Sequence, residues 1–131
     1  MIGRPYLCDS EFANKAFDGK VDDIRPCIGC GRCLTGIMMG KRISCTVNPS
    51  VEDDTIAPAE TKKKVLVIGG GPAGMEAAYV AKKRGHEVVL CEKSNELGGQ
   101  LRLAAVPIAK QELCKVIKFM IRRLDHEGIE V

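Results

Sequence analysis

Three consecutive glycines, residues 69–71, interrupt a regular pattern in the second half of the chain. The segment before them, 64–68 (KVLVI), is a short and nearly continuous aliphatic run, which predicts a buried parallel strand. Pro72 follows, and proline is well tolerated in the first turn of a helix. The next residues are mostly small, with Gly85 as the stop, and predict a helix that approaches a sheet closely. This order of strand, turn and helix favours an α/β fold.

The glycines have the spacing G-x-G-x-x-G, formed by Gly69, Gly71 and Gly74. In this pattern the first glycine makes a tight turn, the second lets the backbone approach a pyrophosphate, and the third brings helix against strand. A second predicted strand, 87–91 (EVVLC), ends beside Glu92, whose carboxylate is placed to accept bonds from both ribose hydroxyls. The context predicts dinucleotide binding rather than a bare structural turn. The carboxylate disfavours NADP, while FAD and NAD both remain open.

The C-terminal part continues the α/β pattern. From about Lys110 the apolar residues follow a helical stripe that ends at Gly128. The stripe consists of Leu113, Ile117, Met120, Ile121 and Leu124. Residues 129–131 then predict the start of a third strand, so that 63–131 is interpreted as the truncated N-terminal part of a Rossmann-like domain.

Four of the seven cysteines form the spacing C-x2-C-x2-C-x11-C: Cys27, Cys30, Cys33 and Cys45. Three thiolates at three-residue intervals can each reach a different iron of a cube, and a fourth from farther along closes the site. The spacing therefore predicts a [4Fe–4S] cluster. Structural zinc is the alternative, although zinc usually takes cysteines in two separated pairs.

The other three cysteines are expected to be structural, because free cysteine is often simply a small buried hydrophobe. Cys91 falls in a predicted buried strand, and Cys114 borders the apolar helix stripe. Cys8 has no nearby partner in the sequence. We expect no nucleophilic cysteine among them.

Composition limits the class of protein further. With 45% hydrophobic and 28% charged residues the chain is globular rather than disordered. No run approaches the ~18 apolar residues of a membrane span, and the start of the chain has no signal-peptide core. We therefore expect a cytoplasmic protein without a membrane partner. The net charge is +3 and aromatic residues are 4%, so the basic runs are interpreted as solvated faces rather than a nucleic-acid site.

Further motifs complete the pattern. They are Gly3-Arg4-Pro5, residues 22–30 (DDIRPCIGC), Cys45 with Asn48-Pro49, and residues 97–101 (LGGQL). Together with the glycine spacing, these residues resemble the multidomain NADH:flavin oxidoreductases of the old yellow enzyme superfamily. That group contains bacterial 2,4-dienoyl-CoA reductase and trimethylamine dehydrogenase. The resemblance covers nearly all of this chain, but the chain covers only a minor part of such a protein.

The resemblance implies roles for individual residues. Gly3 and Arg4 match the motif that holds the FMN phosphate, and the four cysteines of the motif match the cluster ligands. The residues expected to bind FAD are Gly69, Gly71, Ala73, Gly74, Glu92, Gly99, Gln100 and Lys110. The catalytic acid and the substrate pocket would lie outside this chain.

The resemblance also implies an order of domains. Residues 1–26 match the C-terminal remnant of an FMN-binding TIM barrel and 27–50 the iron–sulfur segment, which we expect to be a ligand-rich loop. Residues 51–62 match a linker, and 63–131 the start of the FAD domain. The expected partners are the remaining domains of the parent chain, the FMN barrel and the NAD(P)H domain.

In such a parent, electrons would pass from NAD(P)H to FAD, through the cluster to FMN, and on to an enone or enoyl thioester. The chain alone is expected to be inactive, and incomplete packing of Leu113, Ile117 and Ile121 is expected to favour self-association. Two alternatives remain open at this point: a zinc-stabilised nucleotide-binding module, and an inactive truncated fragment.

Overall fold

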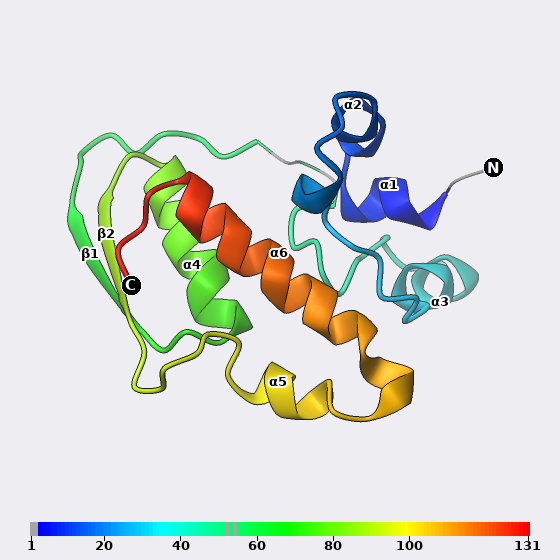
Figure 1. Ribbon diagram of the computed structural model, residues 1–131. Helices are drawn as coiled ribbons and strands as arrows, with labels where there is room; N and C mark the ends of the chain where they lie inside the picture. The colour runs from blue at the N-terminus through cyan, green and yellow to red at the C-terminus, as the bar shows by residue number, and fades with distance from the viewer. Residues whose placement is uncertain (1–2, 52, 54) are drawn as a thin grey trace. The chain divides into compact units, whose positions relative to one another are not determined.

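The computed structural model describes residues 3–51, 53 and 55–131, which form a mixed α/β fold with a small parallel sheet (Figure 1). The chain divides into two compact units, Met1–Thr55 and Ile56–Val131. The boundary between these units falls inside the stretch 51–62 that the sequence predicts as a linker. The finer division of the N-terminal unit into a barrel remnant and an iron–sulfur segment stays a prediction.

The N-terminal unit is built from short helices. They are α1 (Arg4–Cys8), α2 (Phe12–Phe17), the 3-10 turn η1 (Val21–Asp23) and α3 (Arg32–Met38). The prediction that 27–50 is a ligand-rich loop is wrong for residues 32–38, which form α3. Gly31 takes a left-handed conformation (φ 73°) just before α3, and Cys33 is the buried position of that helix. The helical turn therefore carries one cysteine inward while its neighbours stay exposed.

The helix α2 contributes no buried side chain to this unit. None of the residues of α2 is buried, and Phe17 is 93% exposed. Phe12 instead contacts the Tyr6 ring on α1, with 5.4 Å between ring centroids. Helical spacing of apolar residues places them on one face, but burial needs a partner surface for that face.

The C-terminal unit begins with β1 (Lys64–Ile68), α4 (Pro72–Lys83) and β2 (Glu87–Cys91), at the strand bounds that the sequence predicts. The two strands are parallel, with Val65 opposite Val88. Figure 1 shows α4 against the sheet and α6 (Glu112–His126) beside α4. They bury a core of six residues: Met75, Ala78, Val88, Leu90, Leu124 and Ile129.

Two shorter elements precede α6: α5 (Gln100–Ala104), which the sequence did not predict, and the 3-10 turn η2 (Ile108–Lys110). After α6 the chain passes Gly128 and returns to the sheet. Glu130 forms an isolated parallel bridge with Val89, and the Leu90 N–H donates to the Glu130 carbonyl over 2.8 Å. The expected third strand is thus present as a single bridge beside β2.

The prediction that β1 and the end of β2 are buried is wrong for one face of the sheet. Leu66 is 62% and Ile68 is 83% exposed, and Cys91 is exposed as well. Side chains alternate across a strand, and Val65 and Val67 on the other face pack against the core. In an aliphatic run the residues on both faces of the strand are apolar, so the sequence does not reveal which face the helices cover.

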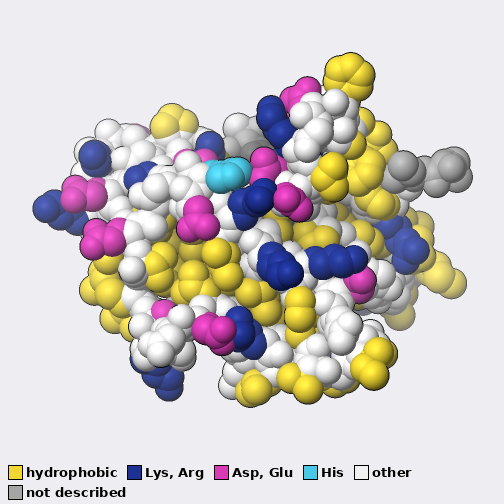
Figure 2. All heavy atoms as spheres, in the orientation of Figure 1, with side chains coloured by type: hydrophobic (Ala, Val, Ile, Leu, Met, Phe, Trp, Pro, Cys, Tyr) yellow, Lys and Arg dark blue, Asp and Glu magenta, His cyan; other side chains and the backbone are white. Residues whose placement is uncertain are grey.

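None of the described helices combines the length and the apolar character needed to cross a membrane. Figure 2 shows Lys and Arg side chains interspersed with Asp and Glu side chains over the face that it draws. Cytoplasmic location and the absence of a nucleic-acid partner stay predictions.

Candidate cofactor and metal sites

The glycine turn after β1 is shaped by close backbone contacts. Gly69 has φ 104°, and its N–H donates to the Cys91 carbonyl at the end of β2 over 2.7 Å. A Cβ on Gly74 would lie 1.9 Å from the Gly69 carbonyl oxygen, so only glycine lets α4 start this close to the strand. A Cβ on Gly71 would meet nothing within 4 Å, which leaves open space at the N-terminus of α4.

The Glu92 carboxylate lies at the same end of the sheet and is held by protein donors. The Gly70 N–H donates to Glu92 Oε2 over 2.6 Å, and the Ser94 N–H and hydroxyl donate to Oε1. The backbone bond from Ser94, followed by that from Gly70, lowers the pKa of Glu92 below its ordinary value. The carboxylate is therefore charged at neutral pH, and its spare lone pairs can accept further bonds.

Gly98 and Gly99 pack against Gly70 and Gly71 of the glycine turn. The Gly98 N–H donates to the Gly70 carbonyl over 2.8 Å, and a Cβ on Gly99 would lie 3.2 Å from the Gly71 Cα. Gln100 follows as the first residue of α5 and is exposed. The sequence predicted Gly99 and Gln100 here but not Gly98, whose left-handed φ of 114° allows the turn.

The remaining expected FAD residues lie at different places. Ala73 is exposed in the first turn of α4, next to the glycine turn. Lys110 ends η2 on the segment between α5 and α6 and is exposed. The structure thus gathers the glycine turn, the Gly98–Gly99 segment, Glu92 and Ala73 at one end of the sheet. Lys110 lies on η2 and is exposed.

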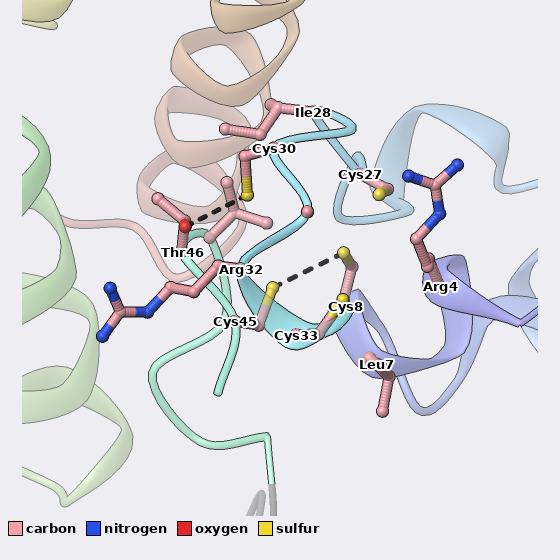
Figure 3. A pocket seen from close by; sticks show the side chains of 12 residues that line it. Arg4, Leu7, Cys8, Cys27, Ile28, Cys30, Arg32, Cys33, Cys45 and Thr46 are labelled. Atoms are coloured by element: carbon pink, nitrogen blue, oxygen red, sulfur yellow. Dashed lines mark hydrogen bonds between the residues drawn. The ribbon is translucent and has the colours of Figure 1, made fainter. Parts of the chain in front are cut away.

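In the N-terminal unit, five cysteines line one small cavity (Figure 3). They include all four of the spaced motif, Cys27, Cys30, Cys33 and Cys45, together with Cys8. The prediction that Cys8 has no partner is wrong, since its sulfur lies 3.6 Å from the Cys45 sulfur. The sequence contains no signal for this, because Cys8 lies nineteen residues before the motif and outside its spacing.

The Cys30 thiol has polar partners. Its sulfur lies 3.2 Å from the Thr46 hydroxyl, and the Arg32 backbone N–H also donates to it. These bonds, with Thr46 first, lower the pKa of Cys30 below its ordinary value. Stabilisation of the thiolate favours metal ligation, because metals bind the deprotonated form.

Four hydrogen bonds, made by the side chains of Asp9, Arg25 and Asn48, hold the cysteine-bearing segments together. The buried Asp9 carboxylate accepts the Arg25 N–H over 2.8 Å and the Lys15 ammonium over 2.7 Å. The Arg25 guanidinium donates to the Cys8 carbonyl, and the buried Asn48 amide donates to the Leu7 carbonyl, each over 3.1 Å. These bonds tie α1 to the segments that precede Cys27 and follow Cys45.

Burial raises the pKa of Asp9, but the hydrogen bonds from Lys15, Arg25 and Glu11 outweigh it. The net result is a pKa below the ordinary value, so Asp9 is a charged anchor at neutral pH. Neither Asp9 nor Arg25 was singled out from the sequence as a site residue.

The thiols around the cavity are a ligand type that both iron–sulfur clusters and zinc ions take. Within the described part of the chain, no three or more Cys, His, Asp or Glu side chains are arranged to hold one ion. The cubane type instead takes each thiolate on a different iron. The charged lining residues are Arg4 and Arg32, which suit the net negative charge of a cluster with four thiolates. The cavity is about 20 Å³, so the cysteine side chains must turn outward to admit a cluster.

The expected FMN-phosphate residues lie at the start of α1. Gly3 precedes that helix and Arg4 is its first residue, and both are exposed. Arg4 also lines the cysteine cavity, as Figure 3 shows. Their assignment to a phosphate stays a prediction.

Known proteins share both halves of this chain. Residues 64–127 match a family model described as FAD dependent oxidoreductase. An NADH oxidase from Thermoanaerobacter brockii is 41% identical over 136 residues, which cover 99% of this chain and 21% of that protein. A cinnamate reductase from Clostridium sporogenes is 41% identical over 134 residues, covering 99% of this chain and 20% of that protein.

A solved structure of a 2-naphthoyl-CoA reductase in complex with 2-naphthoyl-CoA is 36% identical, with a TM-score of 0.91. The match covers 97% of this chain and 20% of that one. The chain therefore spans about a fifth of the length of the relatives that it matches. The relatives are oxidoreductases, and this chain corresponds to a segment of them. The expectation that the chain is part of an oxidoreductase is therefore confirmed.

Proposed function

We propose that the chain is the electron-transfer segment of a flavin- and [4Fe–4S]-dependent NAD(P)H oxidoreductase that reduces activated C=C bonds. The observation that carries this proposal is the meeting of Cys27, Cys30, Cys33 and Cys45 around one cavity. It occurs in a chain that is similar, over 99% of its length, to an NADH oxidase and to a cinnamate reductase. The remaining domains of the parent protein would supply the substrate pocket and the nicotinamide site.

FAD would bind where the strands of the C-terminal unit end, in the manner of a Rossmann-like βαβ unit. Gly71 leaves open space at the start of α4, where the first N–H groups of the helix have no partner within it. Those donors and the helix dipole suit a pyrophosphate. Glu92 is charged and stands beside this space, so it would bind the ribose hydroxyls.

The four spaced cysteines would hold the cluster, which supplies one-electron transfer between the flavins. The chain's own contribution is to bind and orient it. Leu7, Ile28 and Val47 line the cavity with apolar side chains. The Thr46 hydroxyl and the Arg32 N–H hydrogen-bond Cys30, and such bonds to ligand sulfurs adjust a cluster's reduction potential.

Gly3 and Arg4 would contribute a donor to an FMN phosphate bound mainly by the preceding domain. An arginine guanidinium is well suited to this role, because it forms paired hydrogen bonds to phosphate oxygens. In this proposal the cluster held by the N-terminal unit passes electrons between two flavins, FMN bound mainly by the preceding domain and FAD bound by residues 63–131.

The test uses the full-length protein, purified without oxygen. We expect about four irons and matching acid-labile sulfide per chain, with broad visible absorbance that dithionite bleaches. Heat should release FAD and FMN, identified by chromatography. NADH oxidation should depend on an added enone or enoyl thioester. A colourless, zinc-containing protein without flavin would overturn the proposal in favour of a zinc-stabilised nucleotide-binding module.

A further inference from the structure

Cys8 is a fifth thiol in the cysteine cavity, and the proposed ligand set does not use it. Its sulfur lies 3.6 Å from that of Cys45, whereas the four-cysteine motif already supplies a ligand for every iron of a cube. Cys8 is 3% exposed, and Cys45 is half-buried. Figure 3 shows the two sulfurs facing each other across the cavity.

The fold itself enforces this approach. Cys8 is the last residue of α1, and the carbonyl of Leu7 beside it accepts a bond from Asn48, three residues after Cys45. On the other side, the Cys8 carbonyl accepts a bond from the Arg25 guanidinium. The two sulfurs therefore face each other because buried polar contacts fix both of their backbones. The short cysteine side chains are therefore long enough to bring the two sulfurs together.

We propose that Cys8 and Cys45 form a disulfide when Cys45 carries no iron, and that this bond blocks cluster assembly until it is reduced. The bond is a two-electron oxidation. With hydrogen peroxide as the oxidant, two thiols and one peroxide give one disulfide and two waters. With a small-molecule disulfide, thiol exchange gives the protein disulfide and two small thiols.

The exposure of the two thiols sets the order of the steps with peroxide. Cys45 is the more accessible and is oxidised first to a sulfenic acid, with release of one water. The Cys8 sulfur then attacks the Cys45 sulfur and breaks its S–O bond, and the Cys8 proton joins the leaving hydroxide to form the second water. Closing 3.6 Å to a bond of ~2.05 Å needs a movement of about 1.5 Å, which side-chain rotation can supply.

The consequence for the cluster rests on the proposed function. A disulfide at Cys45 removes the fourth ligand, and the three that remain leave one iron of a cube without a thiolate. Cys8 would thus protect Cys45 from further, irreversible oxidation and would couple cluster loading to the supply of reductant.

Tryptic mapping can test the bond directly, because the cysteines fall in different peptides. Cys8 lies in the peptide that ends at Lys15, and Cys45 lies in 43–62. Cys27 and Cys30 share 21–32, and Cys33 lies in 33–41. The full-length protein is stripped of iron with a chelator under reducing conditions and treated with hydrogen peroxide or oxidised glutathione. Free thiols are then alkylated before digestion and mass spectrometry.

We expect a linked pair of the Lys15-ending peptide and 43–62 as the main disulfide product. Cys8→Ser should abolish this product, and Cys114→Ser, the matched control at an exposed cysteine, should leave it unchanged. A main product that joins Cys8 to Cys27, or that leaves Cys8 alkylated, overturns the proposal.

Iron loading is measured in parallel. Oxidised wild type should take up little iron until dithiothreitol is added, and peroxide-treated Cys8→Ser should recover less iron loading after dithiothreitol, because its Cys45 has no partner to stop irreversible oxidation. Loading of oxidised wild type without reductant overturns the proposed block. If the reduced protein never takes up iron while the disulfide forms, the proposed function fails and the disulfide stands.

Discussion

The Gly70 N–H donates a 2.6 Å hydrogen bond to the Glu92 carboxylate and so joins the turn after β1 to the end of β2. A Cβ on Gly70 would lie 2.2 Å from Leu97 Cδ2 and 3.2 Å from Glu92 Cβ, so both side chains would have to shift to admit a larger residue at this position. The expected phosphate site and the expected ribose site are therefore built as one unit. A change in either residue should alter both.

Glu92→Ala in the full-length protein should weaken FAD retention by roughly tenfold or more, because a charged hydrogen-bond acceptor at the ribose is lost. The free Gly70 N–H also leaves the turn less defined. The measurement is flavin content after dialysis, combined with titration of the flavin-free protein with FAD.

Glu96→Ala is the matched control for Glu92. Glu96 is an exposed carboxylate four residues after Glu92, and it pairs with Arg102. Its replacement should leave FAD binding unchanged. If Glu92→Ala keeps its FAD while NADH affinity collapses, the assignment of this site to FAD is reversed.

Substitutions at Gly71 and Gly74 should distinguish an effect on FAD binding from an effect on the stability of the fold. Gly71→Ala adds a methyl group into open space at φ −73°, so the free energy of unfolding should change by less than ~0.5 kcal/mol. FAD content should nevertheless fall, because the methyl group occupies the expected path of the pyrophosphate. Chemical denaturation and flavin content together measure the two effects.

Gly74→Ala should behave in the opposite way. Its Cβ would overlap the Gly69 carbonyl oxygen at 1.9 Å, so strand and helix must move apart at a cost of about 1–3 kcal/mol. Equal loss of stability in the Gly71 and Gly74 variants would contradict this description of the turn.

Iron content tests the cysteine site. Cys30→Ser should remove most of the iron from the reconstituted full-length protein, because a serine hydroxyl is a poor ligand for this cluster type. Cys114→Ser should leave the iron content near four per chain, since Cys114 is exposed on α6 in the other unit. Equal iron loss in the two variants would contradict the ligand assignment.

Much of the C-terminal unit could be predicted from the sequence because its signals are local. The aliphatic runs 64–68 and 87–91 gave the bounds of β1 and β2. The glycine spacing placed the turn and the start of α4. The exposed face of β1 was missed because strand residues such as Ile68 are equally apolar whether or not a layer covers them.

The cysteine cavity was predicted only in part, because its assembly depends on contacts between distant residues. The motif spacing identified four of the cysteines that line it. Cys8 joins them through the bonds of Asp9, Arg25 and Asn48, which link positions 16 to 41 residues apart. The spacing of residues along the chain does not predict contacts between such distant positions.

Asp9 should therefore be the stability anchor of the N-terminal unit. Its side chain is 6% exposed and accepts bonds from Lys15, Arg25 and Glu11. Asp9→Asn should lower the free energy of unfolding by about 1–3 kcal/mol at neutral pH, because a charged acceptor is lost and buried donors are left poorly paired. Asp18→Asn is the control: its ion pair with Lys20 is exposed, and the change should be below ~0.5 kcal/mol.

The stability difference between wild type and Asp9→Asn should depend on pH, which gives a second test of the Asp9 prediction. Folding lowers the pKa of Asp9 below its ordinary value of 3.8, so its contribution is fully present above that pH. It is lost as the pH falls through the lower, folded-state value and Asp9 takes up a proton. Wild type and Asp9→Asn should thus differ in stability at pH 7 and converge in acid. Denaturation curves of both proteins across this range provide the measurement, and a difference that stays constant into acid would show that the charge on Asp9 does not stabilise the unit.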